Sequence, residues 1–282
     1  MLFRSAVGRD QRARGFLLGA THGRTTLNGE GLQHEDGHSL LLASTNPACL
    51  AYDPAYAYEV ATIVREGLRR MYGEGEDVFY YMTLYNETYA MPPMPEGVEE
   101  GIVRGLYRVK EGENGKKMHR AQVFGSGPMV QQALRAQRML AEEHDVSADL
   151  WSATSYQQLR ADALATERWN RLHPGEDRQE SFVAKTLAGL EGPVVAVSDS
   201  MKAVPDQIAR WVTQPFVSLG TDGFGRSDTR EALRRFFETD AEHIVVAVLS
   251  ELADMGEVKP EAVADAIKRY EIDPDRPPPT ST

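Results

Sequence analysis

The sequence predicts an α/β protein. An amphipathic helix runs directly into an apolar, aromatic strand near residue 78, and short apolar strands then alternate with helices along the rest of the chain. Such alternation is typical of a parallel sheet that is covered by helices on both faces. The 282 residues are enough for two domains of ordinary size.

The first helix is expected to begin with Asp53 as its N-cap and Pro54 at the first helical position. Its apolar residues recur every three or four positions, which places them on one buried stripe. The stripe consists of Val60, Ile63, Val64, Leu68 and Met71. The strand that follows, at 78–85, is rich in β-branched and aromatic residues.

The same pattern repeats further along the chain. Further strands are predicted from short apolar runs, and further helices from apolar residues at helical spacing. The expected strands lie at 121–124, 149–153, 194–197, 216–219 and 244–249. The expected helices cover about 129–143, a segment that ends at 172, and 260–270.

Three segments mark the domain organisation. The polar, glycine-containing stretch 111–117 indicates a linker. We therefore expect residues 1–110 to be the C-terminal part of one α/β domain and residues 118–272 to be a complete second domain. The proline-rich residues 273–282 predict a disordered, unpacked tail. Residues 1–9 show no periodic apolar face, so we expect the chain to be a fragment of a longer polypeptide.

Composition excludes several classes of protein. The chain has 31 Lys and Arg against 42 Asp and Glu, a net charge of −11 that opposes a nucleic-acid-binding surface. It contains no apolar run long enough to span a membrane, and its N-terminus lacks the apolar core of a signal peptide. The single cysteine, Cys49, is interpreted as a small core residue. We expect a cytoplasmic protein without a nucleic-acid or membrane partner.

The densest polar segment, residues 28–39, contains His34, Glu35, Asp36 and His38. It matches the H-E-x-x-H motif of zinc proteases, which brings two imidazoles to one metal only on a helix. Three glycines weaken a helix here and no apolar stripe supports one, so no metal ligands are predicted. Two interpretations stay open: a glycine-hinged loop that presents its side chains to a cleft, or an acidic surface loop with solvated histidines.

The glycine-containing loop 220–228 follows an apolar strand and precedes a helix. It could hold a phosphate at the helix N-terminus, but it matches neither nucleotide-binding motif. The favoured interpretation is a tight turn into a helix that Asp228 caps, with Glu231 completing a capping box. Arg226 is the side chain of most interest in this loop.

The segment 88–95 is too rigid and too apolar for a plain linker, because it combines three prolines with two methionines. We expect it to pack against the polar segment 28–39 or to form part of an interface.

Several segments together carry a family resemblance, and the most specific is GRTTLNGEGLQHEDGHS at residues 23–39. The others are residues 52–60, 91–97, 151–155, 168–174 and 220–230. They resemble the homodimeric, decarboxylating (acetyl-transferring) component of bacterial pyruvate dehydrogenase complexes. The resemblance covers about residues 11–272 and corresponds to about the last third of the family's chain.

This resemblance implies a transketolase-like fold, with part of a pyrimidine-binding domain followed by a transketolase C-terminal-like domain. It implies an oxidoreductase that uses thiamine diphosphate and magnesium, decarboxylates pyruvate and reductively acetylates the lipoyl domain of dihydrolipoyl acetyltransferase. It also implies a homodimer. By the same resemblance His34 is the catalytic residue, as a donor to the substrate or as an acid in acetyl transfer. His38, Glu35 and Asp36 are expected to bind the substrate or to support His34.

One departure from the family is expected to matter. The family holds its diphosphate through magnesium with a G-D-G motif that an Asn follows some thirty residues later, and this sequence has no G-D-G. The family's glutamate that activates the cofactor also lies upstream of Gln11. The residues that bind the cofactor are therefore unknown, and we expect this chain to be inactive alone. The alternative is a non-catalytic α/β module that binds an anionic ligand or a protein partner.

Overall fold

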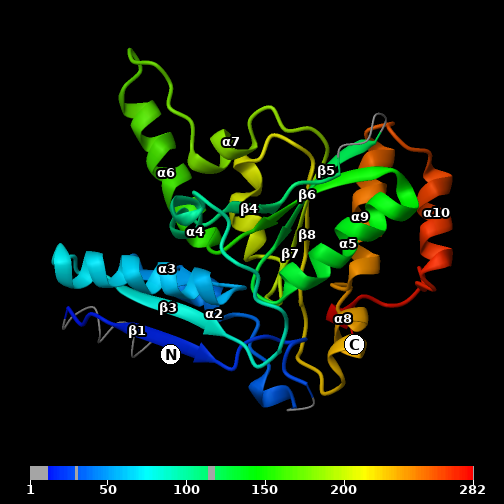
Figure 1. The fold of residues 1–282 in the computed structure, drawn as a ribbon, viewed down its shortest axis with the longest axis horizontal. Helices are drawn as coiled ribbons and strands as arrows, with labels where there is room; N and C mark the ends of the chain where they lie inside the picture. Colours follow the sequence, from blue (N-terminus) through cyan, green and yellow to red (C-terminus); the bar gives the residue numbers. More distant parts are fainter. Residues whose placement is uncertain (1–11, 29–30, 114–117, 282) are drawn as a thin grey trace.

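The structure, a computed structural model, describes residues 12–28, 31–113 and 118–281. Within these ranges the chain forms a three-stranded sheet and a five-stranded sheet, both flanked by helices (Figure 1). The predicted α/β class is confirmed. No helix in the described ranges is long and apolar enough to span a membrane.

The first sheet is parallel and has the strand order β1-β3-β2. Its strands are β1 (Phe16–Ala20), β2 (Cys49–Tyr52) and β3 (Phe79–Leu84). Helix α3 (Ala57–Leu68) lies along this sheet and ends in one π-helical turn, Arg69–Gly73 (Figure 1). Ile63 and Met71 are fully buried against β3, as the predicted stripe requires, whereas Leu68 is exposed.

Helix α3 begins later than the sequence predicts, and Asp53 does not cap it. The Asp53 carboxylate instead accepts hydrogen bonds from Thr83 Oγ1, at 2.7 Å, and from the Tyr85 hydroxyl. The helix instead has Tyr56 as its N-cap, with an extended backbone, and Glu59 accepts a hydrogen bond from the Tyr56 N–H at 3.2 Å. The predicted start at Asp53 and Pro54 is wrong.

The second sheet has the order β4-β6-β5-β7-β8, with only the edge strand β4 antiparallel within the described residues. The four other strands confirm the predictions, with shifted ends for β5 and β6. The strands are β4 (Tyr107–Lys110), β5 (His119–Gly125), β6 (Val146–Ser152), β7 (Val194–Val197) and β8 (Phe216–Leu219). The residues of β4 were expected to belong to the first domain. In the structure they are part of the second sheet.

Helices cover both faces of the second sheet, as Figure 1 shows. On one face pack α5 (Met129–His144) and α9 (Ala241–Asp254), with α10 (Pro260–Arg269) outside them. On the other face pack α6 (Tyr156–Leu172), α7 (Phe182–Leu187) and the 3₁₀ helix η3 (Pro205–Trp211). Phe79 and Tyr81 of the first sheet join this second core, so one apolar cluster connects the two sheets.

The strand predicted at 244–249 is wrong, because these residues form the middle of α9. Ile244, Val245, Val248 and Leu249 are all buried against β7 and α5 at the spacing of a helix. Asp240 caps the helix by accepting a hydrogen bond from the His243 N–H at 3.0 Å. A run of β-branched residues therefore forms a helix here, since the cap and the burial outweigh its strand propensity.

The order of the second sheet reverses beside β5, because the chain moves from β5 to β6 on one side and later to β7 on the other. In open α/β sheets such a reversal leaves a crevice at the carboxyl ends of the two strands, where ligands commonly bind. The segment that follows β2 of the first sheet contacts this edge of the second sheet. The Gly127 N–H donates to the Asp53 carbonyl at 3.1 Å, for example. The two sheets therefore meet at the switch point.

Residues 273–281 contact the second domain, in contrast to the unpacked tail that the composition predicts. The Arg276 guanidinium donates to the carbonyls of Arg235 and Phe236, at 3.3 and 3.2 Å, and lies 4.7 Å from the centre of the Phe236 ring. These carbonyls end a helix and lack helical partners, which a cation can satisfy. The domain boundaries at 110, 118 and 272 stay predictions; residues 1–9 and 114–117 lie outside the described residues.

Candidate functional site

The polar segment 28–39 lies beside the switch point, and its residues 31–38 are called the histidine loop below. Leu32–His34 forms a single 3₁₀ turn (η1), and α2 (Ser39–Ala43) begins with His38 as its N-cap. The two histidines thus lie on different elements, not on one helix as a zinc protease requires. No cluster of three metal-binding side chains occurs within the described ranges.

His34 is exposed at the end of the 3₁₀ turn. Its backbone N–H donates to the Gly31 carbonyl at 3.2 Å. Its imidazole makes no hydrogen bond to any residue that the structure describes. The ring is therefore available to an external group.

His38 is also exposed, but Arg24 holds it. Arg24 Nη2 donates to His38 Nε2 at 3.0 Å, while Nη1 donates to the carbonyls of Thr221 and Gly223. Because a guanidinium can only donate, Nε2 accepts and the proton of a neutral His38 lies on Nδ1. Burial lowers the pKa of Arg24, against the charges of nearby carboxylates. Arg24 thus connects the histidine loop to the loop 220–228.

Glu35 points away from solvent and into the loop 220–228. Its Oε2 accepts a hydrogen bond from the Arg226 N–H, and its buried Oε1 has no partner among the described residues. Gly225 permits this approach, since a Cβ there would lie 2.6 Å from Oε2. Burial raises the pKa of Glu35 to about 7, although the Arg226 N–H and the charge of Arg24 oppose the shift.

Glu35→Gln is expected to change how stability depends on pH. Because the folded state raises the pKa of Glu35 from about 4.5 to about 7, the wild type loses stability as the pH rises between these values. The variant lacks this loss, so its advantage should grow from pH 5 to pH 8 by on the order of 2 kcal/mol. Urea unfolding at several pH values measures this difference.

The control for this measurement is Glu261→Gln, at an exposed position in the first turn of α10. It should leave the pH dependence unchanged. Equal pH dependence of the wild type and Glu35→Gln would show that Glu35 ionises normally in the folded protein.

Asp36 organises the backbone of the histidine loop. Its Oδ1 accepts hydrogen bonds from the N–H groups of His38 and Ser39, both at 3.0 Å. Its Oδ2 lies 3.4 Å from His22 Nδ1. Burial opposes ionisation of Asp36, but the contact with His22 and these hydrogen bonds lower its pKa below the usual range. The Asp36 carboxylate therefore has a structural role, and both of its oxygens already contact the protein.

His22 is buried between Asp36 and the second domain, and its Nε2 lies 3.1 Å from Ser200 Oγ. Ser200, His22 and Asp36 thus have the order of a catalytic triad. A triad serine must reach a substrate carbonyl. Ser200 is 0 % exposed and His22 is 1 % exposed, so no substrate can approach this serine. The arrangement is a buried polar contact between two parts of the chain.

Asp199 makes the most extensive polar contact between the two sheets. It lies just after β7, is fully buried, and accepts four hydrogen bonds. Its Oδ1 accepts from Thr25 N and Oγ1, at 2.8 and 2.6 Å, and its Oδ2 accepts from Thr26 N and Oγ1, at 3.1 and 2.6 Å. Asp199 thereby fixes the segment that leads from β1 into the histidine loop.

Two family models match this chain. The model of the pyruvate dehydrogenase E1 component middle domain matches residues 4–92, and that of the transketolase-like C-terminal domain matches residues 105–240. The pyruvate dehydrogenase E1 component of Pseudomonas aeruginosa is 52 % identical over 268 residues, or 95 % of this chain. This chain is therefore similar to a part of the pyruvate dehydrogenase E1 component. It spans 30 % of the length of that relative.

Other E1 components agree. Those of Mycobacterium tuberculosis and Escherichia coli K12 are 54 % and 51 % identical over 94 % and 95 % of this chain, which spans 28 % and 30 % of their lengths. Solved transketolases share the fold. The enzyme of Pichia stipitis has a TM-score of 0.59 at 17 % identity. The match covers 84 % of this chain and 30 % of the transketolase chain. The transketolase of Campylobacter jejuni has a TM-score of 0.58 at 15 % identity. That match covers 88 % of this chain and 34 % of the transketolase chain.

The residues of this chain do not fit the magnesium and diphosphate of the cofactor that the family resemblance implies. The sequence lacks G-D-G, and the described ranges contain no group of three metal-binding side chains. Two carboxylates near the histidine loop, those of Asp36 and Asp199, accept hydrogen bonds from the protein. No reaction step is therefore assigned to a cofactor held by this chain.

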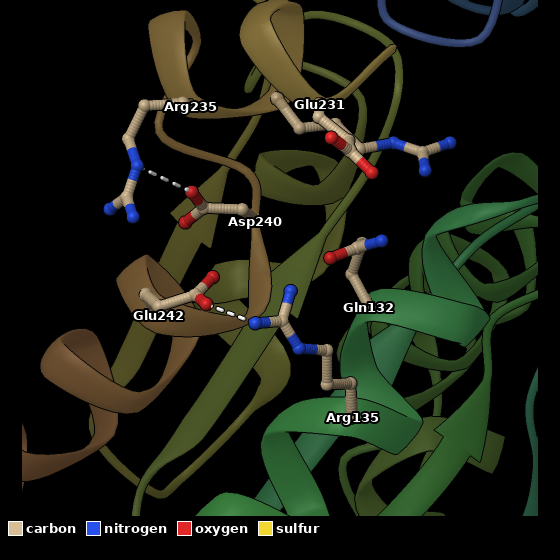
Figure 2. Close-up of a pocket in the computed structure, with 7 residues that line it drawn as sticks. Gln132, Arg135, Glu231, Arg235, Asp240 and Glu242 are labelled. Carbon is tan, nitrogen blue, oxygen red and sulfur yellow. Dashed lines mark hydrogen bonds and ion pairs between the residues drawn. The ribbon is translucent and has the colours of Figure 1, made fainter. Parts of the chain in front are cut away.

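A cavity of about 420 Å³ lies between α5, α9 and the short helix α8 (Arg230–Phe236) (Figure 2). Figure 2 shows that Arg235 pairs with Asp240 and that Arg135 pairs with Glu242. Because two of its arginines pair with two of its carboxylates and none of its lining residues belongs to the histidine loop, we do not regard it as the active site. It is lined by Gln132, Arg135, Glu231, Arg234, Arg235, Asp240 and Glu242.

The loop 220–228 does lead into a helix, but the predicted cap is wrong by one residue. Thr229 caps α8 by accepting a hydrogen bond from the Ala232 N–H at 3.3 Å, and Asp228 accepts from the Thr229 N–H at 2.8 Å. Glu231 then lies one position too early for a capping box. The Arg226 guanidinium lies 4.4 Å from the centre of the Phe236 ring, so it stacks on this helix.

The segment 88–95 packs on α3. The Tyr89 hydroxyl donates to the Ala55 carbonyl, and Met94 Sδ lies 3.9 Å from Thr62 Oγ1. No contact with the histidine loop appears among the described residues. A role in an interface stays a prediction.

Sequence reasoning missed four residues that build the candidate site: His22, Arg24, Asp199 and Ser200. Each is buried and polar, yet none belongs to a motif that we singled out as chemical. The available signal was the polar run 198–200 directly after the apolar strand β7, since the carboxyl ends of parallel strands commonly border a site.

Proposed function

We propose that this chain supplies a donor loop to the active site of a thiamine diphosphate-dependent pyruvate dehydrogenase E1. The whole enzyme decarboxylates pyruvate and reductively acetylates the lipoyl group of dihydrolipoyl acetyltransferase. One observation carries the proposal: His34 presents an unbonded, exposed imidazole, whereas the polar neighbours in its loop are bound to the protein.

This contrast assigns the roles within the loop. Arg24 holds His38, the loop 220–228 holds Glu35, and His22 lies against Asp36. These three residues support the loop, and His34 is left to act on a bound molecule. An imidazole can donate a hydrogen bond or a proton where negative charge develops on the substrate. His34 is therefore the proposed donor to a substrate oxygen or the acid in acetyl transfer.

We also propose that the chain needs further polypeptide for activity. The cofactor motif is absent from its sequence, and it spans about 30 % of its curated relatives. A split-gene transketolase described as an inactive beta4 tetramer has the same fold, with a TM-score of 0.52 at 19 % identity over 84 % of this chain and 66 % of its own. The homodimer, magnesium and the cytoplasmic location remain part of this proposal.

A chimera tests the function. This chain replaces the matching 268 residues of the Pseudomonas aeruginosa E1 component, to which it is 52 % identical. We expect the chimera to acetylate a lipoyl domain with pyruvate, and the isolated chain to show no turnover above background. Mass spectrometry of the lipoyl domain measures the acetylation.

The unaltered Pseudomonas aeruginosa protein is the positive control. Turnover by the isolated chain would contradict its need for further polypeptide. A folded, dimeric chimera without activity would contradict the E1 assignment of this chain and would favour the non-catalytic binding module.

A further inference from the structure

His22 is a buried imidazole that neither the family motifs nor the proposed function uses. It follows β1, and its backbone N–H donates to the Leu84 carbonyl at the end of β3, at 2.9 Å. Its side chain is 0 % exposed. A polar ring at such a position costs free energy unless its nitrogens have partners.

The two ring nitrogens face two different parts of the chain. Nε2 lies 3.1 Å from Ser200 Oγ in the second domain, and Nδ1 lies 3.4 Å from Asp36 Oδ2 in the histidine loop. Asp36 in turn holds the N–H groups of His38 and Ser39. A continuous polar path therefore runs from the second domain through His22 and Asp36 into the loop that carries His34.

A second contact fixes the same loop to the same segment of the second domain. The Met201 N–H donates to the Gly37 carbonyl at 3.0 Å, and Gly23 forms an antiparallel bridge with Asp36. The loop is thus held on both sides by residues that adjoin His22 and Ser200. A change at His22 would act on the loop at the point where these contacts meet.

The groups around His22 favour its charged form. Three carboxylates act on it: Asp36 from the loop, Asp53 after β2 and Asp199 after β7. The Tyr85 ring lies edge-on at 5.6 Å between centroids, and its hydroxyl donates to Asp53. Burial alone would lower the pKa of His22, but the contact with Asp36 and the charges of these carboxylates raise it.

We propose that His22 is a positioning residue that holds the histidine loop in place through Asp36 and Ser200, and that its deprotonation loosens the loop. A charged imidazole can donate to Ser200 through Nε2 and form an ion pair with Asp36 across 3.4 Å, whereas the neutral ring carries no charge for this ion pair. The consequence for catalysis rests on the proposed function of His34. The hold on the loop itself does not.

The sign of the pH effect follows from the raised pKa. The stabilising contact is complete below pH 6.5, the ordinary pKa of histidine, and is lost as the pH rises through the higher pKa of the folded state. The loop should therefore be best ordered in mildly acidic solution and should open more often in alkaline solution.

Hydrogen exchange of the full 282-residue chain tests this proposal, with each rate corrected for its intrinsic dependence on pH. The reporters are the N–H groups of His38, Ser39 and Met201. In the wild type, their protection should fall from pH 6 to pH 9, because the charged form of His22 is lost as the pH rises through its raised pKa. In His22→Gln, which cannot become charged, it should be lower at pH 6 and independent of pH.

The matched control is His173→Gln at an exposed histidine after α6, which should keep the wild-type profile. The N–H groups of strand β5 serve as the internal reference. Ser200→Ala is a second variant, which removes the contact of His22 with the Ser200 hydroxyl and keeps its contact with Asp36. A wild-type profile in His22→Gln, or flat protection in the wild type, would overturn the proposal. Because exchange needs no turnover, an inactive chimera would refute the proposed function and leave this test intact.

Discussion

His34→Ala is expected to lower acetylation of the lipoyl domain by roughly tenfold to thousandfold when it is introduced into the active chimera. The reason is the position of the imidazole, which is exposed at the end of a 3₁₀ turn and makes no hydrogen bond to the described residues. Alanine removes the donor and leaves the supporting contacts of Glu35 and Asp36 in place. Steady-state rates with saturating pyruvate and lipoyl domain measure the loss.

Two control variants make this result specific. His173→Ala removes another exposed imidazole, outside the histidine loop, and should retain the full rate. His38→Ala removes the ring that Arg24 holds and should cost less than His34→Ala. If His34→Ala is as active as the wild type, His34 is a solvated surface residue and the proposed role is wrong.

Asp199→Ala is expected to reduce the free energy of unfolding by about 3–5 kcal/mol. Its carboxylate accepts four hydrogen bonds from Thr25 and Thr26, and two of the donors are backbone N–H groups. A buried donor left without a partner costs about 1–3 kcal/mol. Urea denaturation followed by circular dichroism measures the change in stability.

Asp254→Ala is the matched control, since it removes an exposed carboxylate at the end of α9 and should change stability by less than about 0.5 kcal/mol. Asp199→Asn, which keeps one acceptor, should fall between alanine and the wild type. A loss of less than about 1 kcal/mol in Asp199→Ala would show that water replaces the carboxylate as an acceptor and that the contact between the sheets is weak.

Much of the fold could be predicted from local patterns. Strands β7 and β8 begin and end where their apolar runs do, and α5 follows its helical spacing. The errors arose where tertiary contacts outweighed propensity. The Asp53 carboxylate accepts hydrogen bonds from Thr83 and Tyr85 instead of capping a helix. Residues 244–249 form a helix despite their β-branched side chains. Strands β1, β2 and β4 were not predicted, since each is a short edge strand.

The site was predictable only in part. The histidine loop was recognised from its motif, and the structure places it at the switch point of the second sheet. Its partners come from positions about 180 residues away along the chain, as in the contact of His22 with Ser200. Neither spacing nor composition encodes such a pairing, because it depends on how the two sheets are joined. Burial of Glu35 could not be predicted for the same reason.

The position of Cys49 offers a direct view of motion in the first sheet. It is the single thiol of the chain, it is 2 % exposed on β2, and burial raises its pKa to about 12. Alkylating reagents react with the thiolate, so they can modify Cys49 only while this strand is transiently detached. The rate of alkylation would therefore measure how often β2 detaches from the sheet, and the natural sequence needs no added label for this measurement.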